Sequence, residues 1–470
     1  MSDKRRRGLG GRIERGARLA NTGLRGLAGI AGARARELRD GEAGDPAVIH
    51  EEIAERLAEV LGEMKGAAMK LGQLLSFVDF DLPPEVRTAY HEALAKLRAE
   101  APPFDPDAIA QVVQEDFGAP PHTIFADWQE EPIASASIGQ VHAARLDDGT
   151  EVVVKVQYPG VAEAVRADLR NVEAFKPLVR LLNPNLEVAP LIEELRERVG
   201  DELDYEREAQ YQRAFANRYD GHPFIHVPQI VGDLCRGRVL VSERVRGMSF
   251  DALARSDDEE LKQAVGEAIY RYAFGSIARF RLFNGDPHPG NYLIEDTGDP
   301  SRPRVAFVDY GSVKMFTRER YAQMRAVDDA VVDNDQERFL TAMRDAGFIP
   351  PGVTVNGDRL FEWFRLFTRP VVAEQPFEFT PEFAAEVLRT TTDPRSEYAE
   401  VLRKLNLPPD YLLLNRIQWG INSVLGRLHA TNHWRAIRDE LVVGTPPVTE
   451  LGKLDQQWWE ERDPMIEPPA

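Results

Sequence analysis

The chain has 470 residues, of which 43% are hydrophobic and 29% charged, a balance that fits two or three globular domains or one two-lobed enzyme with extensions. Its single cysteine, Cys235, excludes an intramolecular disulfide and a cysteine-based metal cluster, and it favours a reducing compartment. The formal net charge of −19 argues against nucleic acid as a partner of the main body. No apolar run approaches the ~20 residues of a membrane span, so we expect a cytoplasmic protein.

The first 40 residues carry the opposite charge. They hold eleven Lys or Arg against four Asp or Glu, a net +7 that leaves −26 on the rest of the chain. The segment is rich in Gly and Ala and lacks the uninterrupted apolar core of a secretory signal peptide. Two interpretations stay open: a disordered basic arm, or a weakly amphipathic helix that touches anionic lipid at the inner face of the membrane.

A helical extension follows the arm. Apolar residues at three- and four-residue steps predict a helix over 47–75, which ends in Lys70-Leu-Gly72-Gln73. Two shorter helices are predicted after proline pairs, at about 84–98 and 107–116.

From about residue 123 the pattern changes to strands. A hairpin is predicted from strands at 140–146 and 151–157 around the turn Asp147-Asp-Gly-Thr150. Lys155 lies inside the second, β-branched strand, where a lysine is rare unless it is paired. Nucleotide phosphates and a helix glutamate would supply partners, and the alternative is an edge-strand lysine that faces water.

The loop before this hairpin contains small residues where nucleotide-binding loops are commonly glycine-rich: Ala134, Ser135, Ala136, Ser137 and Gly139. Alanine keeps the loop narrow but disfavours positive φ. We therefore expect a stiffer loop that holds phosphates in a different pose.

Two helices are predicted next, at about 161–181 and 188–218. Asp204 and Glu208 are four residues apart in the second and would share a face, which lets Glu208 meet Lys155 while Glu202 and Asp204 face the mouth of the site. The alternative is an ordinary acidic helix surface.

Strands are predicted at about 224–232 and 237–243. The second resembles a hinge strand, whose backbone near Glu243 and Val245 could bond an adenine. Beyond Glu259 the chain is predicted to be mostly helical, with helices at about 259–281, 317–332, 335–346, 358–367, 380–390 and 409–430, and a terminal helix packed through Trp458 and Trp459.

The segments Asp286-Pro-His-Pro-Gly-Asn291 and Asp309-Tyr-Gly carry the chemistry. Phosphoryl transfer requires that phosphate charge be neutralised and a nucleophile be held in line. Asp286 would orient the nucleophile and take its proton, while Asn291 and Asp309 would hold Mg²⁺ through oxygen ligands. Either segment alone is a common pattern that usually means a solvated turn. An apolar strand at 305–308 that leads into Asp309 favours a kinase-type site, with His288 as a loop-shaping residue.

These residues together resemble the UbiB family of atypical protein-kinase-like proteins over about residues 47–430. The marks of the resemblance are Lys70-x-Gly72-Gln73, the loop 134–140 with Gln140-Val-His142, Val-Lys155-Val-Gln-Tyr-Pro-Gly, Glu202-x-Asp204 with Glu208, and the two segments just described. The chain departs from the family pattern at Ser135, at Asn284-Gly285 where members often carry His-Ala, and at Tyr310 in place of Phe.

The resemblance implies a two-lobed, α+β protein-kinase-like fold that uses ATP or ADP with Mg²⁺. It implies that the helices carrying Lys70, Gly72 and Gln73 cover the site, where Glu202 and Asp204 meet them. We divide the chain accordingly into a basic arm (1–46), a helical extension (47–122), an N-lobe with inserted helices (123–247), a helical C-lobe (248–450) and a tail (451–470).

The function expected is that of a Mg²⁺-dependent ATPase or small-molecule or lipid kinase, linked through the resemblance to quinone or lipid metabolism at membranes. A nucleotide-binding pseudokinase scaffold is the alternative, and a conventional protein kinase is disfavoured because no Ala-Pro-Glu segment follows Asp309. Whether the chain forms a homodimer stays open.

Overall fold

The computed structural model describes residues 105–462, apart from 137, 164, 166–192, 194–199 and 394. The chain divides into two compact units: unit 1 runs to Asp204 and includes Arg236–Leu240, and unit 2 contains Tyr205–Cys235 and the chain from Val241 onwards. The helices predicted over 47–75 and 84–98, and most of that over 161–181, lie outside the described residues. The division of the chain into five segments, from the basic arm to the tail, stays a prediction.

Unit 1 is built on the predicted hairpin. β3 (Gly139–Arg145) and β4 (Glu151–Gln157) pair in antiparallel register along their whole length. Gly149 closes the turn at φ +88, a conformation that glycine adopts without a Cβ clash. β1 (Asp127–Trp128) and β2 (Ala134–Ser135) both pair with β3, and β6 (Val239–Glu243), which begins in this unit, completes the order β1-β3-β4-β6.

A short helical pair accompanies this sheet: α5 (Pro106–Phe117) and α6 (Pro121–Ile124). The Asp105 side chain caps α5, and Gly118 ends it in the left-handed conformation, which confirms the helix predicted at 107–116. Arg238 donates from its backbone N–H and its Nε to Asp116, so the end of α5 is tied to the start of β6.

Unit 2 is organised around α12 (Glu259–Phe280), the predicted long helix. Asp258 caps it by accepting from Leu261 N–H, and Arg281 ends it at φ 56. A four-stranded sheet with the order β5-β10-β9-β7 lies in this unit: β5 (Ile225–His226), β10 (Arg304–Phe307), β9 (Tyr292–Glu295) and β7 (Met248–Ser249). β8 (Leu282–Asn284) pairs separately with β11 (Val313–Met315).

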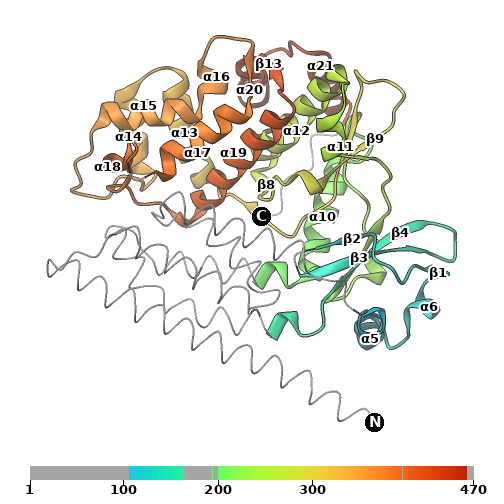
Figure 1. Cartoon of the computed structure of the whole chain (residues 1–470). Coiled ribbons are helices and arrows are strands. Elements are labelled where there is room, and N and C mark those ends of the chain that lie inside the picture. The colour runs from blue at the N-terminus through green and yellow to red at the C-terminus, as the bar shows by residue number, and fades with distance from the viewer. Residues whose placement is uncertain are drawn as a thin grey trace, which may run out of the picture. The chain divides into compact units, whose positions relative to one another are not determined.

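The rest of unit 2 is mostly helical (Figure 1), with the helices α10 (Tyr205–Tyr219), α11 (Phe250–Arg255), α13 (Arg318–Val332), α14 (Gln336–Asp345), α15 (Gly357–Phe367), α16 (Arg369–Val372), α17 (Pro381–Thr392), α18 (Ala399–Leu402), α19 (Pro409–Arg427), α20 (Trp434–Val443) and α21 (Glu450–Glu460). Two short 3₁₀ turns, η2 (Gly232–Leu234) and η3 (Pro289–Asn291), lie between these elements. A strand pair, β12 (Phe377–Glu378) and β13 (Thr431–Asn432), completes the unit. The predicted helices beyond residue 259 are confirmed. Trp459 of α21 packs on the unit 2 core, as expected of the terminal helix. Within the described part of the chain, no helix has both the length and the apolar character needed to cross a membrane.

Two predicted elements are wrong. The helix expected over 188–218 is interrupted at 203–204, where the N–H groups of Leu203 and Asp204 donate to carbonyls three residues back, and α10 begins at Tyr205. Leu203 C=O accepts from the Gln157 side chain at 2.8 Å, so a tertiary contact engages the carbonyl there. Asp204 and Glu208 therefore do not share one helix face. The strand expected over 224–232 is reduced to β5 and an isolated bridge from Ile230 to Ser242.

Candidate active site

The segment from β8 to β9 forms a tight loop that carries Asp286. Gly285 N–H donates to Ser312 C=O at 2.6 Å, which fixes the loop where β8 leaves β11. Within the loop, His288 N–H donates to Asp286 C=O, and His288 Nδ1 accepts from Gly290 N–H at 3.1 Å. The loop-shaping role predicted for His288 is confirmed.

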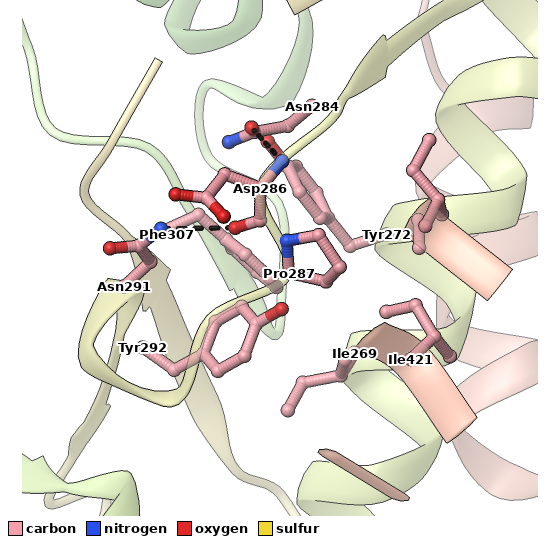
Figure 2. Close-up of a pocket in the computed structure, with 11 residues that line it drawn as sticks. Ile269, Tyr272, Asn284, Asp286, Pro287, Asn291, Tyr292, Phe307 and Ile421 are labelled. Atoms are coloured by element: carbon pink, nitrogen blue, oxygen red, sulfur yellow. Dashed lines mark hydrogen bonds between the residues drawn. The ribbon is translucent and has the colours of Figure 1, made fainter. Parts of the chain in front are cut away.

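Asn291 closes this loop onto Asp286. Its Nδ2 donates to the Asp286 carbonyl at 3.0 Å. Because the amide nitrogen is used in this way, the amide oxygen is left on the opposite branch of the group. Figure 2 shows this oxygen and the Asp286 carboxylate directed to the same side of the loop, away from Ile269 and Ile421. Two oxygen groups of the kind that hard cations bind are thus presented together.

Asp309 joins the same cluster from the end of β10. Val308 N–H donates to Asn291 C=O at 3.1 Å, and the Asn284 Nδ2 donates to Asp309 C=O. The Asp309 Oδ1 accepts from Gly311 N–H at 2.9 Å. Unit 2 therefore brings Asp286, Asn291 and Asp309 together, as the spacing predicts, and we call these three with Asn284 the loop cluster.

Glu208 lies next to the loop cluster. It is buried on α10, at 3% exposure. A Cβ added at Gly311 would lie 3.4 Å from Asp309 Oδ1 and 3.6 Å from Glu208 Oε2, so the two carboxylates flank this glycine. No group of three or more His, Cys, Asp or Glu with metal-site geometry occurs in the described ranges. The donor set fits Mg²⁺, which typically takes one or two carboxylates and completes its shell with substrate phosphates.

A small cavity of about 20 Å³, room for one water molecule, lies behind the loop. Its lining combines Asp286 and Asn291 with apolar side chains of α12 and α19, including Ile269, Ile417 and Ile421 (Figure 2). α19 approaches the loop closely, as shown by the clash that a Cβ added at Gly420 would make with Pro287 Cγ.

In unit 1 the predicted phosphate loop is a hairpin tip. Ala134 and Ser135 pair with Val141 and Gln140, and Ala136 N–H donates to Gly139 C=O at 2.8 Å. Tyr158 lies alongside: burial raises the pKa of its hydroxyl, while a side-chain hydrogen bond with Ser135 lowers it. Ser137 lies outside the described residues.

Lys155 is half-buried on β4, opposite Val141. Its expected partner Glu208 belongs to the other unit, and their pairing stays a prediction.

The acidic turn at 202–204 is anchored by a residue whose role the sequence reasoning missed. Gln157 Nε2 donates to Leu203 C=O at 2.8 Å and to Gly237 C=O at 3.4 Å. Glu202 is half-buried and Asp204 exposed. The only signal for this anchor was a polar residue at the end of an apolar strand.

Lys70, Gly72 and Gln73 lie outside the described residues, so the contact predicted for them stays a prediction.

The hinge predicted at Glu243 lies in unit 2 and makes several polar contacts within it. Its N–H donates to Gln229 C=O at 2.8 Å, and its carboxylate accepts from Gln229 N–H and pairs with His226. His226 Nδ1 also lies 2.5 Å from Glu295. Burial lowers the pKa of His226, but hydrogen bonds and charge from Glu243 and Glu295 outweigh it and raise the pKa to about 9. Val245, just beyond β6, is half-buried, and adenine binding there stays a prediction.

The family model described as the ABC1 atypical kinase-like domain matches residues 96–343. The chain belongs to this family. The ABC1 match thus includes Lys155, Glu208 and the whole loop cluster. The resemblance to the UbiB family that the motifs indicate is confirmed, because the similar curated proteins include several named UbiB.

The rat (Rattus norvegicus) protein named "Atypical kinase COQ8B, mitochondrial" is 30% identical over 72% of this chain and 62% of its own length. The Pseudomonas aeruginosa protein named "Probable protein kinase UbiB" is 32% identical over 64% of this chain and 56% of its own length. The chain therefore spans less than two thirds of these curated relatives.

A solved structure from Mycobacterium tuberculosis, described as the complex of Rv3197 with erythromycin, matches with a TM-score of 0.59 and 31% identity. The match covers 84% of this chain and 97% of that one. The predicted α+β kinase-like fold is confirmed, with a small β-containing unit and a mostly helical one.

Proposed function

We propose that this chain is a Mg²⁺-dependent, ATP-binding enzyme, either an ATPase or a kinase acting on a small molecule or lipid. The observation that carries the proposal is the loop cluster, in which hydrogen bonds join the segments of Asp286, Asn291 and Asp309 within one unit. Membership of an atypical kinase-like family supports it. Support of quinone or lipid metabolism at a membrane surface belongs to the same proposal.

Asp286 acts on the nucleophile. The oxygen of water or of an acceptor hydroxyl bonds to the γ-phosphorus while the bond to the β–γ bridging oxygen breaks, and ADP leaves. Asp286 holds that hydroxyl in line and takes its proton. Asn291 and Asp309 would hold Mg²⁺, which when bound neutralises charge on the phosphates.

The small-residue loop at 134–139 and Lys155 would bind the phosphates from unit 1. Lys155 supplies a positive charge, and the backbone N–H groups of the hairpin tip supply neutral donors. Glu208, buried beside Asp309, would orient Lys155.

The test is thermal stabilisation by Mg²⁺ with ADP or ATP, because a ligand that binds the folded state alone raises stability by about 2.7 kcal/mol at a hundred times its Kd. We expect the parent chain to be stabilised and Asp309→Asn to lose the Mg²⁺-dependent part. Asp257→Asn, an exposed aspartate before α12, is the matched control. Equal stabilisation of Asp309→Asn and parent would refute the metal assignment.

A steady-state ATPase assay with and without anionic liposomes then separates an enzyme from a scaffold. Nucleotide binding without turnover under both conditions would favour the pseudokinase alternative. Stimulation by liposomes that is lost on deletion of residues 1–40, or at high salt, would support lipid contact by the basic arm.

A further inference from the structure

Asn284 and Tyr310, two positions at which this chain departs from the family pattern, are linked by a third residue, the buried Tyr272. Tyr310 follows Asp309 and is fully buried. The hydroxyl of Tyr272, on α12, donates to the hydroxyl of Tyr310 at 3.0 Å. The pKa of Tyr272 is raised well above its ordinary value by burial and by the neighbouring Tyr310 hydroxyl, while a side-chain hydrogen bond with Asn284 acts the other way. Figure 2 shows the ring of Tyr272 extending toward Asn284.

Asn284 connects this pair to both chemical segments. Its Nδ2 donates to Asp309 C=O, and its Oδ1 accepts from Asp286 N–H at 3.3 Å. A primary amide offers a donor and an acceptor on one planar group, and neither a carboxylate nor an aliphatic side chain offers both. Asn284 thus bonds to the backbones of both Asp286 and Asp309.

Aromatic packing holds the two tyrosines in place. The Tyr272 ring stacks on Phe307 of β10, with centroids 3.6 Å apart and planes 20° apart, and Tyr310 packs on Phe215 of α10 at 5.1 Å. Because both rings are buried, each hydroxyl needs a partner, and an unpaired one would cost free energy. A phenylalanine at 310 would keep the aromatic ring but would remove the acceptor of the Tyr272 hydroxyl proton.

We propose that Asn284, Tyr272 and Tyr310 form one positioning unit that holds Asp286 and Asp309 in fixed register and keeps Tyr310 buried beneath the loop. The unit touches no substrate and acts through the backbones of the two aspartates. Its effect on turnover rests on the proposed phosphoryl-transfer function.

Four variants of the full chain test the proposal: Asn284→Leu, Tyr272→Phe, Tyr310→Phe and the double tyrosine variant. We expect Asn284→Leu to lower kcat for Mg·ATP turnover by roughly 10–100-fold, the range for residues that orient reacting groups, with KM changed less than about twofold. Each tyrosine variant should lower kcat by a few fold. The double variant should be no worse than the poorer single one, because the two hydroxyls act together.

Hydrogen exchange of the nucleotide-free protein gives a readout that needs no turnover. Asn284→Leu should raise exchange in peptides covering 284–291, where Asp286 N–H loses its acceptor, and the tyrosine variants should do so to a smaller degree. Tyr270→Phe is the matched control, since Tyr270 is buried on the same helix but packs on Phe274 and Trp434. It should change neither kcat nor exchange at 284–291.

Unchanged kcat and unchanged exchange in Asn284→Leu would overturn the proposal. A lower melting temperature of Asn284→Leu without a selective rise in hydrogen exchange at 284–291 would also overturn it, because that result indicates a merely structural role. If the parent chain shows no nucleotide turnover, the proposed function fails by itself. The exchange measurement then still decides the positioning unit, with raised exchange at 284–291 supporting it and unchanged exchange refuting it.

Discussion

Arg271 and Tyr272 are neighbours on α12, yet they lead into two different polar regions of unit 2. Adjacent helix residues point to different sides. Tyr272 reaches the loop cluster through Tyr310 and Asn284. Arg271 reaches a second region, here called the paired cluster, which consists of Arg271, Glu267, Glu440, Asp455, His222 and Arg279.

The paired cluster consists of buried charges that satisfy one another. Arg271 bonds Glu267 and Glu440, each at 2.7 Å, and its side chain is fully buried. Asp455 on α21 bonds Arg279 at 2.7 Å and His222 at 2.9 Å. Burial raises the pKa of Asp455, but the hydrogen bond with His222 and the charges of Arg279 and Arg271 outweigh it and lower the pKa to about 2.

His222 in this cluster is neutral. Its Nδ1 accepts from the N–H groups of Phe224 and Ile225, so the ring proton is on Nε2 and is donated to Asp455. Burial lowers its pKa in agreement with that geometry. The paired cluster therefore fastens α20 and α21 to α12.

The loop cluster is joined instead through backbone groups and the amides of two asparagines. The comparison teaches that the strongly shifted pKa values of Asp455 and Arg271, of a kind often used to locate active sites, here mark the docking of the C-terminal helices. The loop cluster is recognised instead by the hydrogen bonds through which Asn284 and Asn291 hold the backbones of its two aspartates.

The largest effect that tests this distinction is expected at Asp286. Asp286→Asn removes the group that would take the nucleophile's proton, and should lower kcat by about 10²–10⁴-fold with little change in melting temperature. Steady-state ATPase kinetics and a melting curve measure the two properties. Asp257→Asn is the control. A full loss of stability in Asp286→Asn would mean that the loop cluster, like the paired cluster, is structural.

Asp455→Ala should show the opposite pattern. It removes the ion-pair partner of Arg279 and the hydrogen-bond partner of His222, while Arg271 keeps Glu267 and Glu440. Breaking this largely buried pair should cost about 3–5 kcal/mol of unfolding free energy, while kcat of the folded fraction stays within about twofold. Urea unfolding at pH 7 and activity at low temperature measure these. In the parent chain, the Asp455 contribution is present above its unfolded pKa of 3.8 and is lost as pH falls towards about 2. Loss of activity without loss of stability would contradict this assignment.

The parts predictable from sequence were those set by local signals. The long helix was placed within one residue of Glu259–Phe280, and the structure shows that a local feature, the Asp258 cap, begins it. The association of Asp286, Asn291 and Asp309 also followed from a compact loop and one strand that leads into Asp309.

What the sequence could not provide depends on distant partners. The interruption at Leu203 coincides with a bond from Gln157, 46 residues away, and Asn284 owes its role to a carbonyl 25 residues on. Glu243 was read as a hinge from its strand alone, since nothing local indicates its contact with His226. These contacts become visible only when the chain is folded.

A smaller effect is expected where helix packing meets the loop cluster. Gly420→Ala would place a Cβ in a clash with Pro287 Cγ, so α19 or the Asp286 loop must shift. We expect a cost of about 1–3 kcal/mol, despite the better helix propensity of alanine, together with a lower kcat. Gly237→Ala, with nothing within 4 Å of the added Cβ, is the control. Unchanged kcat and stability in Gly420→Ala would show that the loop tolerates movement of α19.

The smallest effect concerns His226, which belongs to neither cluster and links Glu243 to Glu295. Its pKa is raised from 6.5 to about 9, so its contribution to stability is fully present below pH 6.5 and is lost as pH rises through about 9. Because the Glu243 side chain is 39% exposed, solvent screening reduces the contribution, and we expect about 1 kcal/mol. Urea unfolding of the parent chain and of His226→Gln between pH 6 and pH 10 measures it as the difference between two curves that share every other titration. The two curves should converge at high pH, and a constant separation would show that His226 acts through packing and not through its charge.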